Sequence, residues 1–209
     1  MPHANEKMRV YCLGMSCAHA IWNTRAPNLS YVVRVADQLF MTAAHESHLV
    51  HRRQVSFVGK STRRGAWSLY QVEWESIEAS LRLLARKPAM AERALNWLAA
   101  FQGADLSGVL RVAVQGVGGL RDGIRVDDLY ADSVWCRLLD LMLKKSGDPL
   151  GCLFARLHYL QVPAPIPSSP EKMADYAKEH YNTAAGKATP QLYLDAFRRM
   201  CPWPPEERF

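Results

Sequence analysis

The sequence lacks the apolar segments that would place a protein in or across a membrane. No window approaches about 18 uninterrupted apolar residues, the length that a membrane-spanning helix needs, so we expect no membrane insertion. Residues 1–7 precede no long apolar run, and we therefore expect no signal peptide. No internal repeat or low-complexity tract is visible.

The number and spacing of the cysteines exclude a complete disulfide framework. The count is odd and no Cys-x-x-Cys pair occurs, which favours free thiols in a reducing compartment. His45, His48 and His51 stand three residues apart, whereas zincin histidines are four apart so that both imidazoles share one helical face. We therefore expect no metal site and no cofactor. The five cysteines are Cys12, Cys17, Cys136, Cys152 and Cys201.

What is present is enough apolar material for one ordinary domain. The chain has 209 residues, of which 49% are hydrophobic, and this suits a single globular domain with a sizeable core. Its net charge of +6 fits an acidic polymer partner such as nucleic acid, an anionic membrane surface or a bacterial cell wall. Charge alone does not choose among these partners.

Apolar residues recur with helical period along most of the chain, which predicts an all-α domain. Residues 67–72 have the aromatic and branched content of a short strand or extended loop, so we expect at most a very short β element. Ser30 is the predicted N-cap of the second helix. The predicted helices are 11–21, 30–49, 75–86, 89–101, 106–117, 127–145, 151–160, 170–180 and 190–200.

Glu46 falls on the apolar stripe of the predicted helix 30–49. Burial disfavours the charged form of a carboxyl, and a glycosidase general acid needs that effect. The alternative is a glutamate at the helix edge, ion-paired with Arg52 or Arg53. The stripe itself consists of Val32, Val35, Leu39, Ala43 and Val50.

The residues after Glu46 suit sugar binding. Trp67 and Tyr70 supply flat aromatic faces and Gln71 supplies an amide. Glu73 is either a second carboxylate facing the same cleft or, like Glu75, a charge at a helix start. Basic pairs at 52–53 and 63–64 beside the aromatic residues would instead suit a single-stranded nucleic acid, but no recognised nucleic-acid-binding motif accompanies them.

Three segments resemble the lytic transglycosylases and goose-type lysozymes. Glu46-Ser47 is similar to the Glu-Ser pair that closes a helix in that family. Residues 65–71, Gly-Ala-Trp-Ser-Leu-Tyr-Gln, resemble its Gly-x-x-Gly-Leu-Met-Gln string, with Ser68 in place of the second Gly and Tyr70 in place of Met. Tyr181-Asn182 resembles the family's Tyr-Asn-Ala-Gly, with two extra residues before Gly186.

The likeness is closer to small lysozyme-like proteins of tailed bacteriophages. The shared features are Glu46-Ser47, then Arg-Arg-Gln at 52–54, then Tyr-Gln-Val-Glu at 70–73. Ala-Arg-Leu at 155–157, leading into a Pro-rich turn, and residues 176–189 resemble the C-terminal part of those proteins. The resemblance thus covers residues 40–75 and 148–200, with a generic helical middle.

This resemblance implies a lysozyme-like, two-lobed fold with a catalytic core at 30–160, preceded by a segment at 1–29. A Pro-rich connector at 161–169 and C-terminal helices with a tail at 170–209 would follow. It implies cleavage of the β-1,4 bond between N-acetylmuramic acid and N-acetylglucosamine in peptidoglycan, by a lysozyme or a lytic transglycosylase. Glu46 would be the general acid and then the base. The implied substrate-binding residues are Ser47, Trp67, Tyr70, Gln71, Glu73 and Tyr181.

The expected partners are peptidoglycan glycan strands and other virion proteins. The protein would reside in the virion, or in the host cytoplasm before release. Two alternatives stay open: a virion structural protein that keeps the fold without activity, and a basic nucleic-acid-binding module.

Overall fold

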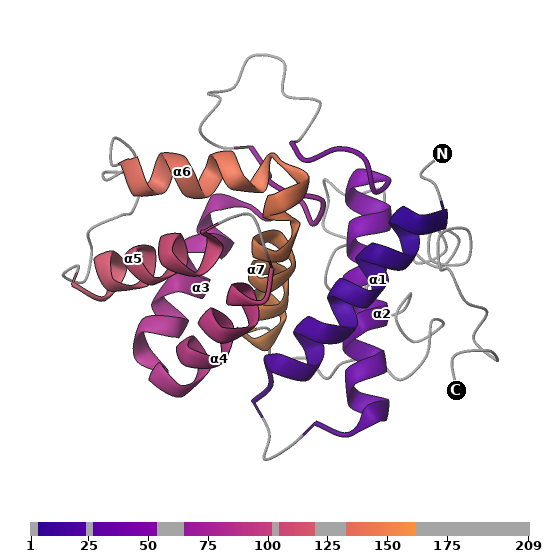
Figure 1. Ribbon diagram of the computed structural model, residues 1–209, viewed down its shortest axis with the longest axis horizontal. Coiled ribbons are helices and arrows are strands. Elements are labelled where there is room, and N and C mark those ends of the chain that lie inside the picture. Colours follow the sequence, from indigo (N-terminus) through magenta and orange to yellow (C-terminus); the bar gives the residue numbers. More distant parts are fainter. Residues whose placement is uncertain (1–3, 24–26, 54–64, 102–104, 120–132, 162–209) are drawn as a thin grey trace, which may run out of the picture.

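The computed structural model describes residues 4–23, 27–53, 65–101, 105–119 and 133–161. Within these ranges the chain is helical and contains no strand, which confirms the all-α prediction for the described part (Figure 1). The predicted helices at 170–180 and 190–200, and the connector from residue 162, lie outside it. The elements are α1 Ala4–Ala20, α2 Leu29–Ser47, α3 Trp74–Arg86, α4 Pro88–Ala99, α5 Leu106–Gly118, α6 Ser133–Met142, the 3₁₀ turn η3 Lys145–Gly147 and α7 Asp148–Gln161.

Helix α7 is the centre of the packing. It contacts α1 and α2 on one side and α3, α4 and α6 on the other, and Figure 1 shows it between these two groups. Every residue from Asp148 to Leu157 is buried. A helix that is buried all round has no polar face, and this explains why its apolar pattern is continuous rather than amphipathic.

Helix α2 begins and ends at residues that differ from the prediction. Asn28, not Ser30, is the N-cap, and its side-chain oxygen accepts a hydrogen bond from the Tyr31 N–H at 2.8 Å. The helix ends at Ser47 because His48 and Leu49 adopt left-handed backbone angles, with φ of 52° and 59°. Val50 is consequently outside the helix and 53% exposed, so it does not belong to the apolar stripe.

Helix α1 is longer than predicted, whereas the starts of α4 and α5 follow local sequence signals. Helix α1 starts seven residues before the predicted position 11, because Ala4–Ala20 is one continuous helix. Pro88 occupies the first turn of α4, where its missing N–H costs nothing. The Asp105 side chain caps α5 by accepting from the Gly108 N–H at 3.0 Å. None of the helices in the described ranges is long and apolar enough to cross a membrane.

Residues 67–72, predicted as a short strand or an extended loop, form a tight turn. Trp67 and Val72 exchange two backbone hydrogen bonds, of 3.0 and 2.8 Å, and the backbone of Arg53 forms an isolated antiparallel β-bridge with that of Trp67. Ser68 and Gln71 adopt φ of 68° and 46° within this turn. The turn brings the chain back on itself directly before α3 and places Gln71 and Glu73 beside α2 and α7.

Candidate active site

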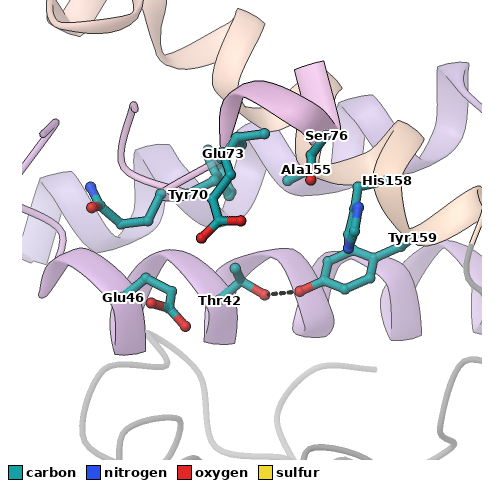
Figure 2. A pocket seen from close by; sticks show the side chains of 10 residues that line it. Thr42, Glu46, Tyr70, Glu73, Ser76, Ala155, His158 and Tyr159 are labelled. Carbon is teal, nitrogen blue, oxygen red and sulfur yellow. Dashed lines mark hydrogen bonds between the residues drawn. The ribbon is translucent and has the colours of Figure 1, made fainter. Parts of the chain in front are cut away.

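A groove of about 270 Å³ lies where α2, the turn at 67–72, the start of α3 and the end of α7 meet. Figure 2 shows Glu46 and Thr42 on α2, with the Glu73 carboxyl reaching toward them from the residue before α3. Two carboxyl groups from different segments thus face one groove. Its lining residues are Thr42, Glu46, Tyr70, Gln71, Val72, Glu73, Ser76, Ala155, His158 and Tyr159.

Glu46 lines the groove but is exposed, so the prediction that it lies within the apolar wall is wrong. The fully buried row on this side of α2 is Leu39, Ala43 and Ser47, each separated by four residues. Glu46 stands on the neighbouring row, four residues after Thr42, and that row faces the groove. Helical periodicity at 100° per residue does not distinguish two adjacent rows of side chains on one helix. The sequence pattern therefore assigned Glu46 to the buried row instead of the row that faces the groove.

Two of the predicted site residues are buried and do not line the groove. The Ser47 hydroxyl donates to the Ala43 carbonyl at 2.7 Å and accepts from the Leu49 N–H at 3.2 Å, so it closes the end of α2. Trp67 is 4% exposed, and the Arg53 guanidinium lies 5.0 Å from its ring centroid. Ser47 and Trp67 are therefore part of the buried interior and not of the groove lining. Tyr181 lies outside the described residues.

Tyr70 lines the groove with a side chain that is only 2% exposed. Burial raises the pKa of its phenol well above the ordinary value, and the nearby Cys152 thiol raises it further. Among the residues that the structure describes, the hydroxyl has no hydrogen-bond partner of good geometry, and it lies against the Cys152 thiol. Tyr70 therefore presents part of its ring to the groove and keeps its hydroxyl in the core.

Gln71 and Glu73 are the predicted residues that reach the groove from the turn. The Gln71 amide donates to the Ser68 carbonyl at 2.8 Å and to the His51 carbonyl at 3.2 Å, so its position is set by the backbone on both sides. Glu73 is the residue before α3, yet its side chain makes no capping hydrogen bond with that helix. Its exposed carboxyl points across the groove instead (Figure 2).

The end of α7 supplies residues that the sequence motifs did not identify. The Tyr159 and Thr42 hydroxyls are 2.7 Å apart and join α7 to α2 (Figure 2). His158 is half-buried, and burial lowers the pKa of its imidazole below the ordinary 6.5, so the ring is neutral at pH 7. No local signal marks His158 or Tyr159, because only the packing of α7 against α2 brings them to the groove.

The basic pairs at 52–53 and 63–64 would suit a nucleic acid, and the histidines near Glu46 were considered as metal ligands. Arg52 is engaged with the buried Asp148, and residues 63–64 lie outside the described ranges. In the part of the chain that the structure describes, no group of three or more His, Cys, Asp or Glu side chains is placed to hold a metal. No disulfide joins the cysteines that the structure describes, Cys12, Cys17, Cys136 and Cys152.

Comparison of the chain with protein-family models, with curated proteins and with solved structures finds no match. Chemically, the groove combines two carboxyl groups, a neutral imidazole, an amide and the hydroxyls of Thr42, Ser76 and Tyr159 in one small space. Carboxylates stabilise a developing positive charge, and amides and hydroxyls exchange hydrogen bonds with sugar hydroxyls.

Proposed function

We propose that this groove binds a glycan strand of bacterial peptidoglycan and that the protein cleaves the β-1,4 bond after N-acetylmuramic acid. The main support for the proposal is that Glu46 and Glu73, which belong to two different segments, line the same groove. Glycosidic cleavage passes through a cationic, oxocarbenium-like transition state, for which a pair of carboxyl groups is the usual catalytic equipment. A lysozyme-like fold is part of the same proposal.

The backbone of the turn supports the resemblance to lytic transglycosylases. Ser68 has a φ of 68°, in the left-handed region that glycine adopts without strain. It stands at the position where the family's string has its second Gly. A turn of the same shape would therefore account for the glycine in that string, and here the serine occupies that conformation.

In the proposed mechanism, Glu46 donates a proton to the glycosidic oxygen as general acid. A glycan strand in the groove would cover this exposed side chain and withdraw it from water. Glu73, from the opposite wall, stabilises the positive charge at the anomeric carbon. Glu46 then accepts a proton from the attacking oxygen, which is the muramoyl C6 hydroxyl in a transglycosylase and water in a lysozyme.

Loss of turbidity of purified cell walls tests the proposal. Glu46→Gln keeps the shape of the side chain and removes its proton-transfer capacity, so we expect activity to fall about 10²- to 10⁴-fold. Glu73→Gln removes the second carboxylate and should also reduce activity. Glu75→Gln is the matched control, because Glu75 is an exposed residue in the first turn of α3 that does not line the groove.

Wild type and Glu75→Gln should clear the walls, and Glu46→Gln should not. Wild-type protein that leaves the walls intact, or a Glu46→Gln variant as active as wild type, contradicts the assignment. Mass analysis of the released muropeptides identifies the attacking oxygen, because an anhydro product is lighter than a hydrolysed one by one water.

A glycan-binding virion protein without catalysis is the second candidate. The exposure of Glu46 favours it, since a general acid needs a buried carboxyl whereas glycan binding does not. This candidate predicts sedimentation of the protein with purified walls, with neither turbidity loss nor soluble muropeptides. The same binding by wild type and Glu46→Gln would then be expected.

A further inference from the structure

A fully buried carboxylate, Asp148, begins the central helix α7. Its Oδ1 accepts from the Arg52 Nε at 2.8 Å, and its Oδ2 accepts from the Arg52 Nη2 at 2.8 Å. Oδ2 also accepts from the Arg9 Nη2 at 2.5 Å. Because moving a charge out of water is costly, a buried carboxylate is stable only when it is paired in this way. The two-pronged contact with Arg52 joins residues that are 96 positions apart in the sequence.

Arg52 is also held through its backbone. Its carbonyl accepts a hydrogen bond from the Ser68 N–H at 3.0 Å, inside the turn at 67–72. The carbonyl of the preceding residue, His51, accepts from the Gln71 side-chain amide at 3.2 Å. The segment 51–52 is therefore fixed to α7 by a side chain and to the turn by two backbone oxygens.

This segment connects the two walls of the groove. Glu46 lies near the end of α2, six residues before Arg52, and Glu73 follows the turn directly. A displacement of the segment 51–52 would move the turn, and with it Gln71 and Glu73, relative to Glu46. We infer that the Asp148–Arg52 pair sets the position of Glu73 opposite Glu46, and that Arg52 is a positioning residue. The catalytic part of this inference rests on the function proposed above.

Arg9 provides an internal comparison. It donates to the same Asp148 oxygen as Arg52, but it comes from α1 and its other side-chain partner is Glu6. Among the described residues its side chain makes no hydrogen bond to the turn at 67–72. Two arginines thus stabilise one buried charge, and only one of them is attached to the groove.

Arg52→Lys tests the inference, with Arg9→Lys as the matched control. Lysine keeps the positive charge but cannot reproduce the two parallel hydrogen bonds of the guanidinium. We expect Arg52→Lys to lower kcat about tenfold or more with little change in KM, because a displacement near 1 Å at a catalytic group has effects of that order. Hydrogen exchange of the Ser68 amide should become faster in the same variant. Arg9→Lys should leave kcat and this amide near wild type.

The two measurements separate this inference from the proposed function. If wild-type protein cleaves no glycan, the proposed function fails, and exchange at Ser68 alone decides whether the pair positions the turn. Unchanged exchange at Ser68 in Arg52→Lys, or equal changes in Arg9→Lys, overturns the inference. If Arg52→Lys does not fold, Asp148→Asn is measured in its place, with the same expected and contradicting results.

Discussion

Replacing Gly151 by alanine tests how tightly α7 supports the turn beside the groove. A Cβ atom added at Gly151 would lie 2.3 Å from the Ser68 Oγ and 2.4 Å from the Ser68 Cβ. The nearest ring atom, Cδ2 of Tyr70, would be at 3.3 Å. Real Cβ atoms do not approach this closely, so the helix and the turn must separate. Position 151 of α7 therefore cannot carry a side chain while Ser68 is present.

The expected loss of stability follows from two opposing effects. Overpacking of a buried contact costs about 1–3 kcal/mol, and the upper end applies here because the Ser68 Cβ is fixed to its backbone. Alanine is the better helix former by about 1 kcal/mol, which offsets part of that cost. We expect Gly151→Ala to lower the free energy of unfolding by roughly 2 kcal/mol.

Ser68→Gly should rescue the Gly151→Ala variant. It removes both clashing atoms and relieves the left-handed backbone conformation, worth about 1 kcal/mol. It also removes the hydrogen bond from the Tyr70 N–H to the Ser68 Oγ at 3.1 Å, a loss of about 1 kcal/mol. Ser68→Gly alone is therefore close to neutral. The double variant keeps the helix preference of alanine without the clash, so it should be about 1 kcal/mol more stable than wild type.

Urea unfolding of the four proteins in this double-mutant cycle is the assay. The expected coupling energy between the two substitutions is about 3 kcal/mol, which is the steric cost that Ser68→Gly removes. A double variant as unstable as Gly151→Ala would refute the proposed steric contact. A Gly151→Ala variant as stable as wild type would show that the turn can move away from α7 at no cost.

Two further predictions concern the dependence of stability on pH. Hydrogen bonds from Arg9, and then from Lys145, lower the pKa of Glu6 from 4.5 to about 2, so its contribution is complete above pH 4.5 and is lost as the pH falls toward 2. Because the group is partly exposed, Glu6→Gln should cost about 1–2 kcal/mol at neutral pH and almost nothing near pH 2, measured by urea unfolding at both values. Burial lowers the pKa of His158 below 6.5, so the unfolded chain binds more protons there and wild-type stability should fall as the pH drops below 6.5. His158→Gln should flatten that fall, and identical slopes for both proteins would contradict the assignment.

Local patterns in the sequence predict the helices well because they depend on neighbouring residues. Ile77, Leu81 and Leu84 recur at helical spacing and are buried along α3 as expected. The first turn of α4 contains Pro88, which the sequence also marks as a boundary. The N-cap of α2 was misplaced by two residues, since Asn28 and Ser30 are both competent caps and only the backbone path distinguishes them.

The candidate site was also predicted only in part. The motif residues Glu46, Gln71 and Glu73 line the groove, whereas Ser47 and Trp67 have the right residue types but point into the core. A motif specifies residue types and their order. It does not specify which row of a helix faces solvent.

By itself, the sequence determined the all-α class of the described part and the two segments that carry the groove's carboxyl groups. Helical periodicity and turn residues act over a few positions, and these are properties of the local chain. Only the tertiary structure decided that Asp148 pairs with Arg52, and that His158 and Tyr159 complete the groove. Those contacts depend on how α7 packs among five other helices, and no local pattern encodes a distance across the fold.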